Sequence, residues 1–116
     1  MTTQEPIVDL DELLANLGGD EQLANQLLER IRQDLPQRLA SLRDALERGD
    51  TAAAHQCSHP IKGALASVRA VDARQYAEVV DNAAREDGLD TARAALPELE
   101  AAVERLQAFI EQRLAD

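Results

Sequence analysis

The stretch LPQRLASLRDALERGD, residues 35–50, decides the fold class of this chain. Its leucines stand at positions 35, 39, 42 and 46, which is the spacing of one apolar face of an α-helix. Gly49 and Asp50 follow, a helix-ending residue and then one suited to begin the next helix. We therefore expect a long amphipathic helix, a tight break, and a second helix running back along the first. Pro36 is predicted to bend or interrupt the first helix, because proline removes a backbone hydrogen bond.

Similar signals precede this stretch. Asp9 with Glu12 three residues later resembles a capping box, and Gly18-Gly19 closes the short helix that would follow. Asp20 is then suited to begin the helix that contains the leucine-rich stretch. Its first apolar positions are Leu23, Leu27, Leu28 and Ile31. The sequence thus predicts a short helix ahead of the first long one.

Three further helical segments are expected after Asp50. One runs from about Thr51 to Ala70, and Ile61, Leu65 and Val68 define its core-facing side. The next begins with a capping box at Asp72 and Gln75, has apolar Tyr76, Val79, Val80 and Ala83, and stops at Asp87-Gly88. The last begins at Asp90 and has an apolar stripe of Leu96, Leu99, Val103, Leu106 and Ile110, with a possible kink at Pro97.

Composition supports an all-helical fold. Alanine, leucine, glutamate and arginine predominate, whereas the chain of 116 residues has one Tyr, one Phe and no Trp. Short connections make neighbouring helices antiparallel. We predict an all-α protein, an antiparallel four-helix bundle with a short additional N-terminal helix. Residues 1–8 form an N-terminal tail in this prediction, and residues 9–116 form a single domain.

Charge and motifs exclude several classes of function. The chain has 22 acidic and 12 basic residues, a formal net charge of −10, which argues against binding to nucleic acid or to an anionic membrane. It has no glycine-rich phosphate loop, so we do not expect it to bind ATP or act as an autonomous kinase. A single cysteine, Cys57, and the absence of a secretion signal or membrane span favour the cytoplasm.

The acidic residues leave one part of the chain free. Residues 51–71 contain no Asp or Glu, yet they hold both histidines and the only lysine, Lys62. On a helix His59 would face solvent, opposite the core-facing side, with Lys62 and Gly63 beside it at i+3 and i+4. A neutral imidazole is a usable nucleophile, and a fixed cation would stabilise a phosphoryl group that it attacks. Glycine in a helix interior is unfavourable, so Gly63 suggests that another molecule approaches closely there.

The pattern His59-x-x-Lys62-Gly63, about ten residues after a Gly-Asp helix break, resembles the signature of histidine phosphotransfer (HPt) domains. The resemblance extends from about Asp9 to Leu114. It implies that His59 accepts a phosphoryl group from the aspartate of one receiver domain and passes it to another, with Lys62 and Gly63 in support. It also implies a monomeric protein without a cofactor of its own, since the divalent ion needed for transfer would be on the receiver partner.

The resemblance further points to the residue 22 positions after the histidine, where several members carry a polar side chain that orients the imidazole. That position is Asp81, and Arg85 lies one turn further on the same face. A carboxylate bonded to Nδ1–H would favour the tautomer with a lone pair on Nε2. The alternative is that Asp81 and Arg85 form an ordinary ion pair along the helix.

Two residues depart from the family pattern. Pro60 stands where Ser or Thr is common, and it should either kink the helix beside His59 or begin a new helix there. Arg69 stands where we would expect a glycine to end the motif. Together with His55 and Ala66, these two residues are predicted to belong to the surface that docks the receiver.

Two other functions stay open from the sequence. The departures at Pro60 and Arg69 are compatible with a degenerate bundle that binds a receiver or another partner without carrying phosphate. His55 and His59, at i and i+4, could instead hold a metal ion, but no third ligand is evident and Cys57 falls on a different face. We therefore predict no metal site.

Overall fold

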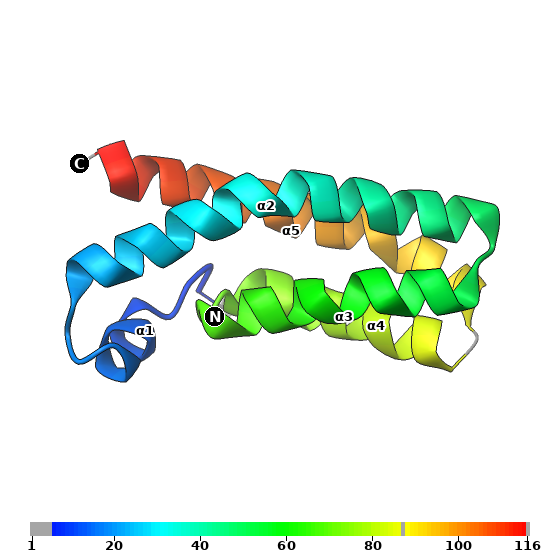
Figure 1. Ribbon diagram of the computed structural model, residues 1–116, viewed down its shortest axis with the longest axis horizontal. Helices are drawn as coiled ribbons and strands as arrows, with labels where there is room; N and C mark the ends of the chain where they lie inside the picture. Colours follow the sequence, from blue (N-terminus) through cyan, green and yellow to red (C-terminus); the bar gives the residue numbers. More distant parts are fainter. Residues whose placement is uncertain (1–5, 87, 116) are drawn as a thin grey trace, which may run out of the picture.

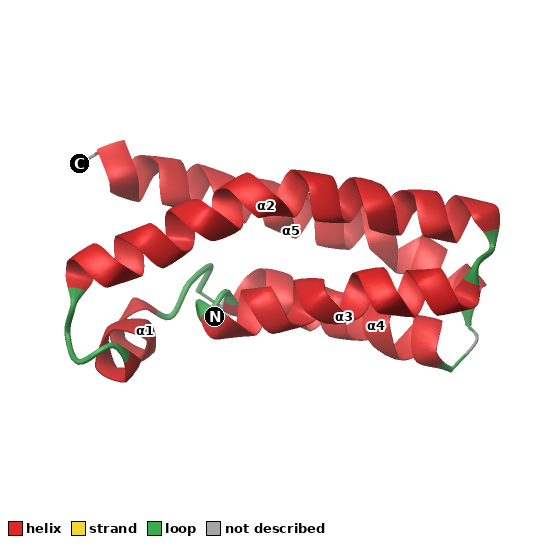
Figure 2. Cartoon of the chain, in the orientation of Figure 1, coloured by secondary structure: helices red, strands yellow, loops and turns green. Residues whose placement is uncertain are grey.

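A computed structural model describes residues 6–86 and 88–115 of the chain. Within these residues every regular element is a helix (Figure 2). The helices are α1 (Leu10–Asn16), α2 (Glu21–Arg48), α3 (Thr51–Ser67), α4 (Val71–Arg85) and α5 (Leu89–Ala115). Figure 1 shows α2 and α5 on one side of the bundle and α3 and α4 on the other. Each long helix packs against the next in the chain, and α5 returns to α2, so the predicted antiparallel four-helix bundle with a short N-terminal helix is confirmed.

The predicted breaks between the first helices are confirmed. Gly49 ends α2 in the left-handed region, with φ at +69°, and the Asp50 side chain accepts a hydrogen bond of 3.0 Å from the backbone N–H of Ala53. Asp9 and Asp20 cap α1 and α2 in the same way, by accepting bonds from the N–H groups three residues later. These bonds satisfy N–H groups that have no partner inside the helix.

The core of the bundle follows the predicted apolar stripes. Ile61 and Leu65, on the inner face of α3, and Val68, directly after its end, are fully buried, as expected. The same core includes buried residues of the other long helices, namely Leu28, Leu35, Leu42, Leu46, Val80, Leu96, Leu99, Val103, Leu106 and Ile110. Two apolar positions of the expected stripes are exposed instead, Leu23 and Val79. No helix in the described part of the chain is long and apolar enough to cross a membrane.

The prolines do not break the helices that contain them. α2 continues through Pro36, α3 through Pro60 and α5 through Pro97, so an interruption at Pro36 and a new helix start at Pro60 were wrong predictions. All three prolines lie on exposed faces, where water can bond to the carbonyl that has lost its N–H partner. Figure 1 shows the axis of α2 changing direction between its first and second halves, as a proline bend would produce.

The start of α4 also differs from the prediction. α3 ends at Ser67 and Ala70 precedes α4 without a side-chain cap, so Asp72 does not act as the cap. Asp72 lies inside the first turn and accepts two hydrogen bonds, of 2.8 and 3.1 Å, from the guanidinium of Arg105 on α5. The ion pair with Arg105 thus takes the place of the capping bond that the sequence predicted for Asp72.

The remaining predicted boundaries are near the observed ones. α4 ends at Arg85, and the expected stop at Asp87 lies outside the described residues. α5 begins at Leu89, which places Asp90 in its first turn. Of the predicted N-terminal tail, residues 1–5 lie outside the described part, whereas Ile7 and Val8 pack against the core.

Candidate phosphotransfer site

His59 lies on the outer side of α3 and its side chain is 65% exposed. The inner side of the same helix is fully buried at Ile61 and Leu65, so the predicted orientation of the ring toward solvent is confirmed. Lys62 and Gly63 follow one helical turn later, on the same outer side. The local sequence alone accounts for this part of the site, because helical periodicity fixes which residues share a face.

Asp81, on α4, is the centre of the site. Its side chain is only 1% exposed, and Ser58 Oγ donates a hydrogen bond of 2.9 Å to its Oδ1. Its Oδ2 lies 3.5 Å from His59 Nδ1 and 3.2 Å from the ammonium of Lys62. His55 Nε2 is 3.5 Å from Oδ1. The packing of α4 against α3 thus brings one carboxylate to four side chains of α3.

The carboxylate remains charged in spite of its burial. Burial raises the pKa of Asp81, but the hydrogen bonds from Ser58, Lys62 and His59 and the positive charge of Lys62 outweigh it and hold the pKa below its ordinary value. Asp81 is therefore an acceptor near neutral pH, with no proton to donate. Such an acceptor favours the tautomer of His59 with the proton on Nδ1, the ring nitrogen that faces the carboxylate, and with the lone pair on Nε2.

Gly63 leaves open space next to the histidine. A Cβ atom added to Gly63 would meet nothing within 4 Å outside the backbone of its own helix. Nothing inside the chain therefore requires glycine here, and its conformational cost in a helix interior has no internal compensation. The half-buried Ala66 lies one turn beyond Lys62. Two small residues, Gly63 and Ala66, thus lie on the side of His59 toward the end of α3.

Arg69 has a structural role that its position in the sequence did not reveal. It is the one non-glycine residue of the described chain with positive φ, at +56°, where glycine is the favoured residue. Its Nε lies 3.0 Å from a carboxylate oxygen of Glu12, and its carbonyl accepts a hydrogen bond of 2.9 Å from the N–H of Asp9. These contacts join the start of α1 to the end of α3.

Arg85 is not part of the cluster around Asp81. It is exposed, and within the described residues it donates a hydrogen bond of 2.9 Å to the side chain of Asn82. The alternative of an ordinary ion pair between Asp81 and Arg85 is therefore wrong.

Sequence reasoning missed one residue of the cluster, Ser58. It is buried, on the same side of α3 as Ile61 and Leu65, and it precedes the exposed His59 directly. A small polar residue in the apolar phase of a helix needs a hydrogen-bond partner, which was the available signal. The identity of that partner, Asp81, could come only from the packing of α4.

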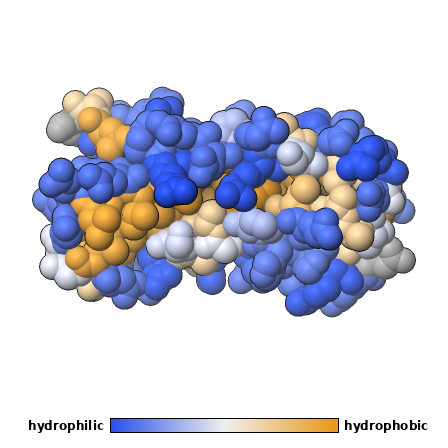
Figure 3. All heavy atoms as spheres, viewed as in Figure 1, coloured by the Kyte–Doolittle hydropathy of each residue, from blue (hydrophilic) through white to orange (hydrophobic). Residues whose placement is uncertain are grey.

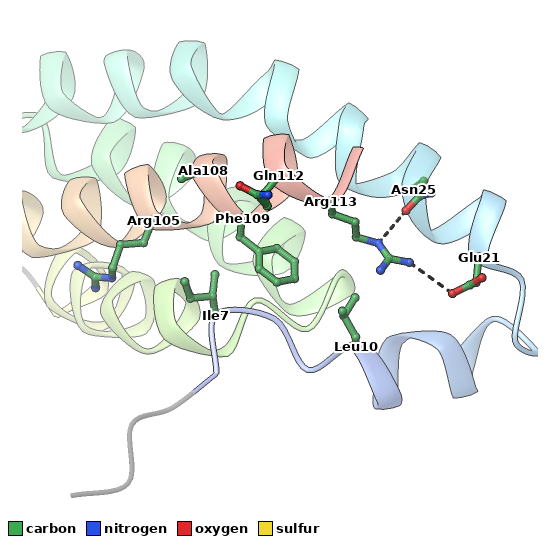
Figure 4. A pocket seen from close by; sticks show the side chains of 9 residues that line it. All are labelled: Ile7, Leu10, Glu21, Asn25, Arg105, Ala108, Phe109, Gln112 and Arg113. Carbon is green, nitrogen blue, oxygen red and sulfur yellow. Dashed lines mark hydrogen bonds and ion pairs between the residues drawn. The ribbon is translucent and has the colours of Figure 1, made fainter. Parts of the chain in front are cut away.

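A pocket of about 690 Å³ lies elsewhere, between the N-terminal segment, α2 and α5. Figure 4 shows Ile7, Leu10 and Phe109 around it, with Arg113 bridging to Asn25 and Glu21. It contains none of the residues around His59. In the view of Figure 3 much of the bundle surface is hydrophilic, with an apolar area at the end where α1 lies.

Comparisons with known proteins identify the family of the chain. Residues 26–109 match the model of the Hpt domain family, and the chain belongs to that family. It is a histidine phosphotransfer protein of two-component signalling. Its fold is similar to the crystal structure of histidine-containing phosphotransfer protein B (HptB) from Pseudomonas aeruginosa PAO1, with a TM-score of 0.83 and 28% sequence identity over 95% of this chain and 96% of the other. A search of curated proteins found no match.

Proposed function

We propose that His59 carries the phosphoryl group and passes it between aspartates of receiver domains. The observation that supports this most directly is the bond between His59 Nδ1 and the buried Asp81. It holds the ring in one orientation and keeps the lone pair on Nε2, the nitrogen turned away from the carboxylate. An exposed imidazole without such a partner would have neither its tautomer nor its orientation fixed.

In the transfer step, the lone pair of His59 Nε2 attacks phosphorus and forms the N–P bond. The bond between phosphorus and the receiver's aspartate oxygen breaks, and the aspartate leaves as a carboxylate. The proton on Nδ1 stays in place, so the phosphorylated ring is cationic. Asp81 stabilises that positive charge at close range, and the reverse reaction onto a second receiver restores the neutral ring.

Lys62 supplies the positive charge that the phosphoryl oxygens require. Its side chain is 27% exposed, so it can reach solvent as well as Asp81. The divalent ion that assists the transfer is expected on the receiver, and the chain contributes no cofactor. The surface around His59 includes Gly63, and residues 51–71 contain no Asp or Glu. Such a surface suits a partner that carries negative charge.

The experiment is a single-turnover transfer from a radiolabelled phosphorylated receiver. The wild-type chain should take up label that is labile to acid, as expected for a phosphoramidate. His59→Gln should take up none while keeping its helical content and its unfolding midpoint, because the side chain is mostly exposed. Unchanged labelling of His59→Gln would overturn the assignment.

The same measurement addresses the alternative of a bundle that binds without carrying phosphate. That hypothesis rested on Pro60 and Arg69, but α3 is continuous through Pro60 and Arg69 occupies the left-handed position that ends the helix. Binding of a receiver without any transfer, by a chain that is fully folded, would support it.

A further inference from the structure

We propose that His55, His59 and Asp81 form a site for a zinc ion, and that zinc bound there prevents His59 from accepting a phosphoryl group. The second half of this proposal rests on the function proposed for His59. A metal site on the two histidines lacked a third ligand in the sequence. The packing of α4 against α3 supplies one, since the donor atoms of these three side chains lie within 4.8 Å of one another.

The distances suit a small tetrahedral ion. His55 Nε2 is 3.5 Å from Oδ1 of Asp81, and His59 Nδ1 is 3.5 Å from Oδ2 of the same carboxylate. Zinc bonds of about 2.0–2.1 Å in a tetrahedron place neighbouring ligand atoms about 3.3–3.4 Å apart. The donor atoms, which lie within 4.8 Å of one another, would have to move closer together, and rotation of the two partly exposed rings would allow this. The ring centroids of His55 and His59 are 5.7 Å apart, and the ring planes make an angle of 41°.

The ligand set favours zinc over the hard divalent ions. Two imidazoles and one carboxylate match zinc, whereas magnesium and calcium prefer oxygen ligands. The fourth position is open to water, because the side chains of His55 and His59 are 38% and 65% exposed. A zinc ion can thus enter from solvent and bind at the edge of the bundle.

Two groups already contact the carboxylate of Asp81, and one of them competes with the ion. Lys62 lies 3.2 Å from Oδ2, and Ser58 donates to Oδ1. Lys62 must move away when zinc binds, which its partial exposure permits, whereas Ser58 can keep its bond to the second lone pair of the oxygen. We therefore expect reversible binding, weaker than at a structural zinc site.

The effect on His59 follows from the count of protons on the ring. A neutral imidazole carries one proton and one lone pair. Zinc on Nδ1 uses the lone pair of that nitrogen, so the proton must be on Nε2. Nε2 then has no lone pair with which to attack phosphorus, and the N–P bond cannot form until the metal leaves.

Binding is tested first, by calorimetric titration of the full chain with zinc chloride and with magnesium chloride. We expect one zinc per chain and no heat from magnesium. His55→Gln should abolish zinc binding. Cys57→Ser, which changes a nearby residue of α3 that is not a ligand of the site, should leave zinc binding intact. Circular dichroism verifies that both variants are folded. No zinc binding by the wild type, or full binding by His55→Gln, would overturn the site.

Transfer is tested next, in excess magnesium, with and without zinc. At a zinc concentration about ten times its Kd, about a tenth of the chain is metal-free, so the wild-type rate should fall about tenfold. The rate of His55→Gln, whatever its value without zinc, should not change when zinc is added, which separates this site from any effect on the receiver. An unchanged wild-type rate would overturn the inhibition. Absence of transfer without zinc would instead contradict the function of His59, and calorimetry would still decide the metal site.

Discussion

The ammonium of Lys62 lies 3.2 Å from Oδ2 of Asp81, the same oxygen that His59 Nδ1 approaches. The cation predicted for the phosphoryl group and the ring predicted to carry it are therefore held by one atom. That atom belongs to a buried side chain on the neighbouring helix, so the geometry of the site depends on the packing of α3 against α4. Changes at Asp81 should affect both groups together.

Asp81→Asn should slow phosphoryl transfer by about 10- to 100-fold, by analogy with the loss of a carboxylate that orients a metal-binding histidine. The uncharged amide has one oxygen and cannot accept hydrogen bonds from His59 and Lys62 as the carboxylate does. The substitution should therefore lower the free energy of unfolding by about 1–3 kcal/mol. Single-turnover transfer and urea unfolding measure the two effects. Glu78→Gln, which removes a half-exposed carboxylate on α4 that pairs with Arg74, is the control, and an equal loss in that variant would contradict the role of Asp81.

The pKa of Asp81 predicts how stability depends on pH. Because the pKa is lower in the folded chain than in the unfolded one, the unfolded chain binds more protons between the two values. The stabilisation by Asp81 is complete above the unfolded pKa, about 3.9, and is lost as the pH falls through the folded pKa. Asp81→Asn should therefore lose less stability than wild type between pH 5 and strongly acidic pH. Parallel losses in urea titrations would disprove this contribution.

Gly63→Ala should separate stability from transfer. The added methyl group meets open space in the free chain, and alanine should raise the free energy of unfolding by about 0.5–1 kcal/mol. If the receiver approaches the helix at this point, the same methyl group should slow transfer. Urea unfolding and transfer assays test the pair of effects, and a variant that is more stable with an unchanged transfer rate would show that Gly63 is not covered by the partner.

Arg69→Gly and Arg69→Ala should differ by about 1–2 kcal/mol in favour of glycine, because alanine bears the cost of the left-handed backbone. Both variants lose the ion pair with Glu12, so the difference between them isolates the backbone term. Thermal or urea unfolding provides the comparison. Equal stabilities would mean that the backbone relaxes out of the left-handed region once the arginine is removed.

The local features of the fold were predictable because they depend on neighbours in the chain. The left-handed end of α2 at Gly49 and the cap at Asp50 are set within a few residues. The exposure of His59 opposite Ile61 follows from helical periodicity alone. The same reasoning failed at Asp72, where Arg105, 33 residues away, provided a partner stronger than the local one.

By itself, the sequence determined the helices, their order, the inner face of each and the exposed histidine with Lys62 and Gly63 beside it. Only the tertiary structure decided that Asp81 binds His55, Ser58, His59 and Lys62 and that Arg69 joins α3 to α1. The physical reason is the range of the interactions. Periodicity and capping act within one or two turns, whereas a buried carboxylate is satisfied by whichever donors the packing of two helices brings to it.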